Sequence, residues 1–503
     1  MRSRSKALYP GHAQQEPIMS NSDIDPPRLY AAREPIFPRR VHGWFRNLKW
    51  IIMAVTLAIY YVTPWIRWDR GPGMPDQAVL IDLANRRFYF FWIEIWPHEF
   101  YFVAGLLVMA GLGLFLFTSA LGRVWCGYAC PQTVWTDLFL LTERWVEGDR
   151  NARLRLWNAP WSARKLRLRL VKWVVWLLIS VATGGAWIFY FTDAPTLLGN
   201  LFTGTAHPVA YITMGILTAT TFLFGGFARE QICVYACPWP RIQAAMMDED
   251  TLTVAYREWR GEPRGKLHKG EPTKSDGGAK GDCIDCMACV NVCPMGIDIR
   301  DGQQLECITC ALCIDACDEV MDKIGKPRGL IDYMALKDET AERSGAAPKP
   351  VLKHILRPRT MLYFTLWAGI GVALVVALFL RSPFDLNVTP VRNPLYVTMA
   401  DGAIRNTYAL RLRNKQGAER DFAVSVTGSD GAAPQGISLT LEGLPDAGVK
   451  VAADSTHTQR VYITAEKDSA LAEAAQSELT LWVEDVTDGV KSRIGTVFHG
   501  RSE

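Results

Sequence analysis

The chain has 503 residues, which is too long for one compact domain and enough for about three. Its formal net charge is only +4 and it carries no RNA- or DNA-reading motif, which argues against a dedicated nucleic-acid binder. Apolar residues make up 49% of the sequence, but they gather in long uncharged runs that alternate with charged ones. This uneven distribution is typical of a membrane protein.

Residues 1–45 are polar and rich in Pro and Arg, and we expect a cytoplasmic N-terminal tail. The first apolar run begins near Leu48, too late for a cleaved secretory leader. Residues 46–247 predict a membrane domain with four spans, and residues 360–381 a fifth transmembrane helix, because a helix needs about 20 apolar residues to cross a bilayer. The apolar stretches lie at Leu48–Trp65, Phe100–Leu121, Trp173–Phe191, Val209–Phe227 and Met361–Leu380.

The basic residues of the loops predict the orientation of these spans. The loop from Gly122 to Lys172 contains ten Lys and Arg residues against four Asp and Glu. The loop from Asp193 to Ala206 contains no Lys or Arg. We therefore expect the N-terminus and the first of these loops on the cytoplasmic side. The chain returns to that side after the fourth span, and the fifth span exports the C-terminal part.

Two short cysteine motifs follow the second and fourth predicted spans. CGYACP contains Cys126 and Cys130, and CVYACP contains Cys233 and Cys237, so span and motif form an internal repeat. On a helix this spacing would place both sulfurs on one face, although the proline after each second cysteine favours a helix end there. Four thiols at one membrane face suit Cu(I), zinc or an iron–sulfur centre, since all accept soft sulfur ligands. Apolar cysteines filling helix contacts are the alternative, which the duplicated neighbours disfavour.

Residues 248–281 are charged and rich in Gly and Pro, which predicts a linker that lets the next module stand off the membrane. Residues 282–336 contain eight of the twelve cysteines, in two runs with the spacing C-x2-C-x2-C-x3-C. This spacing is that of bacterial ferredoxins with two [4Fe–4S] clusters, in which the fourth cysteine of each run binds the other cluster. Structural zinc, which uses separated C-x2-C pairs, and disulfides are the alternatives.

The predicted ligand sets therefore cross between the two runs of this ferredoxin α+β module. One cluster is assigned to Cys283, Cys286, Cys289 and Cys317, and the other to Cys307, Cys310, Cys313 and Cys293. Proline follows the first run, whereas Asp318 stands at the corresponding place after the second. That difference weakens one turn and leaves both ligand sets complete. We predict two [4Fe–4S] clusters as the cofactors.

A second polar linker is expected at residues 337–359. Residues 382–503 then change to short alternating stretches, such as YALRLRN and RVYITAE, separated by Gly, Asp and Asn turns. The pattern predicts an all-β immunoglobulin-like sandwich of about seven strands, which the fifth span would place in the periplasm. Every cysteine precedes the fifth span, in agreement with a reducing compartment on the other side.

Taken together, these parts resemble the cytochrome c oxidase accessory proteins of the CcoG, FixG and RdxA family, from about residue 40 to the end. The resemblance rests on the repeated C-x3-C-P spans, the two-cluster module, the last span and the sandwich. It implies a bacterial inner-membrane oxidoreductase that reduces Cu(II) to Cu(I) for the copper centre of cbb3-type cytochrome c oxidase. It also implies that copper is the substrate and that Cys126, Cys130, Cys233 and Cys237 hold it or take part in its reduction.

Two other functions stay open on the sequence. Related C-x3-C-P spans occur in membrane electron-transfer proteins of the NapH and NosR kind. In this alternative the chain is a membrane electron-transfer subunit that passes electrons between quinol and the clusters. As a non-enzymatic scaffold, it would bind the oxidase through exposed edge strands of the sandwich. In the copper hypothesis the partners are the membrane, the oxidase or its copper-delivery proteins, and an unidentified cytosolic electron donor.

Overall fold

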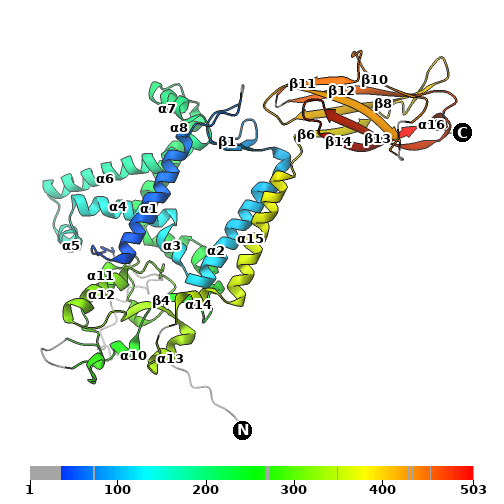
Figure 1. Ribbon diagram of the computed structural model, residues 1–503. Coiled ribbons are helices and arrows are strands. Elements are labelled where there is room, and N and C mark those ends of the chain that lie inside the picture. Colours follow the sequence, from blue (N-terminus) through cyan, green and yellow to red (C-terminus); the bar gives the residue numbers. More distant parts are fainter. Residues whose placement is uncertain are drawn as a thin grey trace, which may run out of the picture.

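The structure is a computed structural model that describes residues 35–71, 74–266, 272–347, 349–428, 431–432, 434–453 and 455–501. The greater part of the predicted N-terminal tail therefore lies outside the described residues. Figure 1 shows a bundle of long helices with a compact module around α11 and α12 at one end and a β-sandwich at the other. The two extramembrane parts thus lie at opposite ends of the bundle.

Five helices in the described residues are long and apolar enough to cross a membrane, as the sequence predicts. They are α1 (Trp44–Val62), α2 (Tyr101–Leu121), α6 (Ala163–Thr183), α8 (Pro208–Phe222) and α15 (Pro358–Phe379). Three of them continue into short turns, namely η1 (Thr63–Trp65), η3 (Gly185–Tyr190) and the π-helical η4 (Leu223–Ala228). Large apolar side chains along these helices stay exposed, such as Phe379 at 84%, because a bilayer rather than protein covers them.

Glycines bring α2 and α15 close together. A Cβ atom added at Gly105 would lie 2.7 Å from Leu374, and one added at Gly371 would lie 3.2 Å from Met109. Small residues allow helix backbones to approach closely in a membrane, where packing rather than the hydrophobic effect drives association. The fifth span is therefore packed along the second, as Figure 1 shows.

A buried ionic cluster holds the segment between the second and third spans. This segment forms α3 (Val124–Tyr128), α4 (Pro131–Val146) and α5 (Arg150–Asn158). The Glu143 carboxylate of α4 contacts Arg153, Arg229 and Lys172, the last with an Nζ–Oε1 distance of 3.7 Å. These partners come from α5, the end of the fourth span and α6. Losing one partner of a buried ionic cluster costs about 3–5 kcal/mol. The cluster therefore holds α4 against the third and fourth spans.

At the opposite end of the bundle, a small sheet lies beside the sandwich and contacts it. It consists of β1 (Val79–Asp82), β2 (Arg87–Phe90) and β3 (Ile93–Ile95), beside η2 (Pro97–Glu99) and α7 (Ala194–Thr203). The Arg413 guanidinium lies 3.8 Å from the ring centre of Trp96, and Arg381 Nε lies 2.9 Å from Glu99 Oε1. The cation–π contact thus attaches the sandwich to the segment just before the second span, and the ion pair attaches the end of the fifth span to η2.

The expected linker at residues 248–281 is instead part of the folded module. Its elements are β4 (Leu252–Tyr256), α10 (Glu258–Gly261) and η6 (Lys274–Asp276). β4 is buried along its whole length and pairs antiparallel with β5 (Ile331–Ala335). The charges that suggested a flexible segment are paired, for example Arg260 Nε with Asp282 Oδ2 at 2.6 Å. The prediction that this segment lets the module stand off the membrane was therefore wrong.

The module contains α11 (Ala288–Val292), η7 (Ile299–Asp301) and α12 (Leu312–Ile324), and it packs directly on the membrane domain. The Asp315 carboxylate accepts hydrogen bonds from the backbone N–H groups of Phe45 at 3.2 Å and Arg46 at 2.7 Å. These N–H groups lie in the first turn of α1, where no intrahelical acceptor exists and a carboxylate is favoured. One side chain of the module thus caps the first span.

The second expected linker, residues 337–359, is also structured. It contains η8 (Leu336–Asp338), α13 (Glu339–Arg343) and α14 (Val351–Ile355). Asp338 is buried, pairs with Lys349, and lies 3.0 Å from His354 Nε2. A short folded segment therefore leads from the module into α15.

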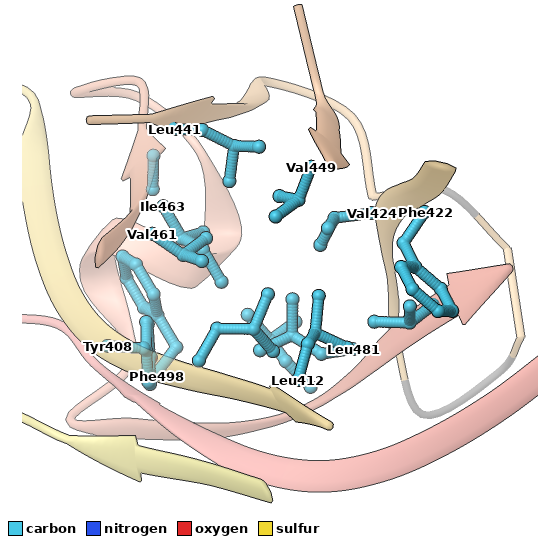
Figure 2. Close-up of a cluster of buried hydrophobic side chains, with 14 of the residues drawn as sticks. Tyr408, Leu412, Phe422, Val424, Leu441, Val449, Val461, Ile463, Leu481 and Phe498 are labelled. Carbon is cyan, nitrogen blue, oxygen red and sulfur yellow. The ribbon is translucent and has the colours of Figure 1, made fainter. Parts of the chain in front are cut away.

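The C-terminal part is the predicted two-sheet sandwich, with nine described strands where about seven were expected. The strands are β6 (Phe384–Pro390), β7 (Val397–Thr398), β8 (Ile404–Asn414), β9 (Arg420–Gly428), β10 (Ile437–Leu441), β11 (Gly448–Val451), β12 (Thr456–Ala465), β13 (Gln476–Asp485) and β14 (Lys491–His499). One sheet has the order β10-β12-β8-β6, with β7 beside β8, and the other β11-β9-β13-β14. Figure 2 shows inward side chains of both sheets, including Leu412 and Leu481, meeting in one core.

Candidate iron–sulfur and thiol sites

The eight cysteines of the module line two neighbouring cavities. Cys283, Cys286, Cys289 and Cys317 line a cavity of about 340 Å³, including its opening to solvent. Cys307, Cys310, Cys313 and Cys293 line another of about 380 Å³, measured in the same way, which Cys289 also touches. The structure therefore places the fourth cysteine of each run in the cavity of the other run.

Unusual backbone conformations wrap both runs around these cavities. The residues on either side of the second cysteine have positive φ, with values of 54° and 58° at Asp285 and Met287 and 55° and 57° at Thr309 and Ala311. Non-glycine residues adopt this conformation at a cost, so a repeated pair indicates a functional loop. Successive N–H groups in such turns point to one side and form a concave anion site. Two equivalent loops thus present thiols and N–H groups together.

The thiols fit iron–sulfur clusters better than single metal ions. Among the described residues, no three His, Cys, Asp or Glu side chains lie close enough to hold one metal ion, although four cysteines surround each cavity. Thiols spread around a space suit a polynuclear cluster, whereas zinc needs its four ligands within about 2.3 Å of one point. Burial and the neighbouring cysteines raise the pKa of Cys293 to about 12, so its charged form requires a bound cation.

The two C-x3-C-P motifs have similar local structures, each with a helical first cysteine and an extended second cysteine. Cys126 lies within α3, and Cys130 is the extended residue before Pro131, at which α4 begins. Cys233 lies in the π-helical η5 (Ile232–Ala236), and Cys237 is likewise extended, before α9 (Trp239–Met246). Each proline therefore ends its helix at the second cysteine, which was one of the two expectations from the sequence.

The fold brings the four thiols of the motifs together. All four cysteines are half-buried and free. Burial raises the pKa of Cys233 to about 12, and Cys130, Cys126 and Cys237 lie near enough to add to this increase. Burial also raises the pKa of Cys126, and the nearby Arg123 guanidinium opposes the increase. The thiols that follow the second and fourth spans therefore lie near one another, although no three of them are close enough in the described structure to hold one metal ion.

This thiol group rests against the wall of the second cavity. Cys126 and Cys233 pack on a buried cluster that includes Ile308 and Cys310. A Cβ atom added at Gly127 would lie 2.6 Å from the Ile308 carbonyl oxygen, so only glycine permits this approach. The neighbouring Tyr128 hydroxyl donates a hydrogen bond to the Cys310 carbonyl at 3.2 Å. The backbone of the first C-x3-C-P motif thus lies directly against the backbone of the second cysteine run.

Two polar residues near the thiols were missed by sequence reasoning. Cys126 Sγ donates to Gln243 Oε1 at 3.1 Å, and Gln243 Nε2 donates to Thr118 Oγ1 at 3.2 Å. Arg123 is only 4% exposed and donates to the Leu305 carbonyl of the module. An arginine precedes both motifs in the sequence, and this repeat is the signal that could have identified Arg123. No pattern marks Gln243.

Comparisons with known proteins agree with this division of the chain. Three family models match: a 4Fe-4S binding domain at residues 102–151, a 4Fe-4S dicluster domain at residues 228–336, and an IG-like fold at the C-terminus of FixG at residues 374–501. Each C-x3-C-P motif falls within one of the two iron–sulfur matches. A crystal structure of a FixG-related protein from Vibrio parahaemolyticus matches 24% of this chain and 100% of its own, with 16% identity and a TM-score of 0.21.

The chain is also similar to curated proteins over most of its length. Protein RdxB of Cereibacter sphaeroides is 70% identical and covers 96% of this chain and 100% of its own. Protein RdxA of the same species is 63% identical over 94% of this chain and 98% of its own. The nitrogen fixation protein FixG of Rhizobium meliloti is 56% identical over 88% of this chain and 85% of its own.

The five spans and the iron–sulfur domains define a multi-pass membrane iron–sulfur protein, a class whose cofactors carry electrons. Within this class, the identities and the matched C-terminal domain show that the chain belongs to the FixG/RdxA family.

Proposed function

We propose that the chain is a membrane-bound cupric reductase that supplies Cu(I) for the copper centre of cbb3-type cytochrome c oxidase. The observation that carries the proposal is the contact between the C-x3-C-P thiol group and the wall of the second ferredoxin cavity. Reduction adds one electron to Cu(II), and we assign the origin of that electron to an unidentified cytosolic donor. Copper would enter as substrate and leave for the oxidase or its copper-delivery proteins.

The ligands of the two clusters would be the eight cysteines of the module, each cavity supplying four. When bound, the clusters supply one-electron transfer. The residues of the chain then have separate tasks. The half-buried thiols provide soft sulfur, which favours Cu(I) over harder ions. The side-chain oxygen of Gln243 accepts a hydrogen bond from the Cys126 thiol and so orients that sulfur. Arg123 lies beside the same thiol and provides a positive charge at the junction with the module.

Replacing all four thiols of the motifs tests the proposal. Serine offers a hard and mostly protonated hydroxyl, so the variant with Cys126, Cys130, Cys233 and Cys237 all changed to Ser should lose Cu(I) binding almost completely. Its iron–sulfur absorption and its reduction by dithionite should persist. The measurement is anaerobic stopped-flow absorption, in which Cu(II) should reoxidise the reduced wild type but not the variant. Reoxidation of the variant at the wild-type rate would mean that these thiols do not meet copper.

A second candidate function is electron transfer between quinol and the clusters, as in proteins of the NapH and NosR kind. The match of residues 102–151 to a 4Fe-4S binding domain favours this function over copper binding. That region contains Cys126 and Cys130 but no ferredoxin run, so the match associates the motif thiols with iron–sulfur proteins. A redox change of the purified protein that follows added quinol and ignores Cu(II) would support this candidate.

We also propose the orientation expected from the basic loops, with the module cytoplasmic and the sandwich periplasmic. The opposite placement of these two parts in Figure 1 supports opposite sides, whichever side each occupies. Reporter fusions after residue 300 should give a cytoplasmic signal, and fusions after Arg381 a periplasmic one. A cytoplasmic signal after Arg381 would refute this topology.

A further inference from the structure

A polar cavity lies beside the start of α1, where the first span begins and the ferredoxin module packs. Its volume is about 1140 Å³, including the open mouth. Three arginines, Arg40, Arg46 and Arg144, contribute to its lining together with His42 and the rings of Trp50 and Trp145. The cavity is separate from both cysteine sets.

Two of these arginines have unused hydrogen-bond donors. Arg46 Nη2 and Arg144 Nε are buried and have no hydrogen-bond partner within the described part of the chain. The residue Arg46 is only 5% exposed, and its other nitrogen, Nη1, lies 3.4 Å from both carboxylate oxygens of Asp137. Among the described residues, Arg144 Nη2 donates to the carbonyls of Pro38 and Arg39, both at 3.4 Å. Buried N–H groups without partners are costly, so such a pair indicates a missing acceptor.

The charge balance of the cavity points to an anionic acceptor. Asp137 is the carboxylate that Arg46 contacts, and it is shared with Lys49, whose Nζ lies 3.0 Å from the same oxygen. Burial and the neighbouring Arg46 lower the pKa of Arg144, which Asp137 and Asp149 oppose in part. Guanidinium groups pair well with phosphate, since a planar fork of donors matches its oxygens. A phosphate bound to the arginines that line the cavity would reduce the repulsion between them.

The position of the cavity indicates where that phosphate comes from. Exposed apolar side chains surround the start of the span, namely Trp44 at 72%, Leu141 at 45% and Trp145 at 78% exposure. Tryptophans and basic residues at the end of a span mark the headgroup level of a bilayer. We propose that this cavity binds the phosphate of an anionic phospholipid, with Arg46 and Arg144 as donors and with Leu141 and Trp145 against the acyl chains.

The lipid would also stabilise the docked ferredoxin module. Arg46 donates its backbone N–H to Asp315 of the module at 2.7 Å, while its side chain faces the cavity. A headgroup that orders this side chain also orders the first turn of α1, to which the module is attached. Anionic lipid should therefore protect the module from dissociating from the membrane domain.

The test uses the full-length protein in detergent, mixed with defined lipids and analysed by native mass spectrometry. Wild type should retain one phosphatidylglycerol and bind phosphatidylcholine at least about tenfold more weakly. Arg144→Gln should weaken phosphatidylglycerol binding by about tenfold, and Arg144→Lys by less, because it keeps the charge but loses the fork. The matched control is Arg155→Gln, which removes an exposed arginine of α5 outside the cavity and should bind as wild type does.

Iron–sulfur absorption of each variant verifies folding, and no electron transfer is measured, so the outcome is independent of the proposed cupric reduction. Inorganic phosphate forms the second arm. If phosphate alone raises the unfolding temperature of wild type and phosphatidylglycerol does not, the occupant is free phosphate and the lipid assignment is overturned. Equal loss of lipid binding in Arg144→Gln and Arg155→Gln would also overturn the site, since the effect would then come from general charge.

Discussion

The two cysteine sets of this protein differ in how the fold holds them. The eight cysteines of the module surround two cavities, in loops with repeated positive φ values and with neighbours buried in a common core. The four cysteines of the C-x3-C-P motifs are all half-buried and stand at helix ends, at the junction of two spans. In the proposed function, the first set would hold the resident clusters and the second set would take up and release copper.

The difference also extends to the supports of each set. The module is held on the membrane domain by Asp315 and by the glycine contact at Gly127. The thiol group is instead contacted by two side chains of the membrane domain, Gln243 and Arg123. In the proposed function, the backbone contacts would support a resident cofactor and these side chains a substrate.

Loss of the resident cofactors is the largest effect that this comparison predicts. Wild type should contain about eight iron and eight sulfide per chain, from two [4Fe–4S] clusters. The double variant Cys286→Ser and Cys310→Ser removes one ligand from each cavity and should lose the absorption and the reduction of Cu(II). It should still bind Cu(I), because the other four thiols are unchanged. Iron analysis and Cu(I) titration are the measurements.

A wild-type count near twelve iron would contradict the division into two sets. The C-x3-C-P thiols would then hold a third cluster, and the copper assignment of Cys126, Cys130, Cys233 and Cys237 would fall. The quadruple serine variant is the control, since its iron content should equal that of wild type.

The contact between the two sets gives the next prediction. In Gly127→Ala the new Cβ meets the Ile308 carbonyl at 2.6 Å and Cys310 Cα at 3.0 Å, so the module must shift. The clusters should remain, but reoxidation by Cu(II) should slow by about tenfold or more, because small displacements of reacting groups are expensive. Gly111→Ala in α2 meets nothing within 4 Å and should react like wild type. Stopped-flow rates at equal iron content compare the two variants.

If Gly127→Ala keeps the wild-type rate, the thiol group does not have to touch the module. Copper would then be reduced elsewhere, and the contact between the two cysteine sets would have no role in electron transfer.

Several features were predictable because their signals are local. Long apolar runs predict spans, and the alternating strands of the sandwich follow a period of two residues. The cysteine spacing alone predicted the crossed ligand sets that line the two cavities. Pro131 and Pro238 likewise indicated helix ends at the preceding cysteines, and the backbone there is extended.

Other features depend on contacts between distant segments. Leu252–Tyr256 pairs with Ile331–Ala335, so its burial cannot be recognised in a stretch surrounded by charged residues. Those charges also led to the wrong prediction of a flexible linker. Arg257, for example, pairs with Glu342, which lies far along the chain, with an Nε–Oε2 distance of 2.9 Å. Composition does not distinguish a solvated charge from one that finds a partner after folding. The direct contact between the two cysteine sets was hidden for the same reason.

Arg123 gives the smallest predicted effect and separates charge from packing. The residue stands between the sets, since it affects the pKa of both Cys126 and Cys307 and donates to Leu305 of the module. Its counterpart in the repeat, Arg229, is instead bound to Glu143. Arg123→Gln should therefore slow Cu(II) reduction more than it lowers the thermal stability of the module.

Removing one positive charge beside thiols that must lose protons should lower Cu(I) affinity by about fivefold, which corresponds to ~1 kcal/mol. Arg123→Lys keeps the charge and should recover most of the affinity, although it cannot reproduce the planar hydrogen bond to Leu305. Competition titrations with a Cu(I) chelator measure the affinity, and thermal unfolding measures the loss of packing. A purely structural role would lower the unfolding temperature of both variants equally and leave the affinity of the folded protein unchanged. In that case the charge at the junction does not assist the exchanging thiols, and their openness alone has to explain how they take up copper.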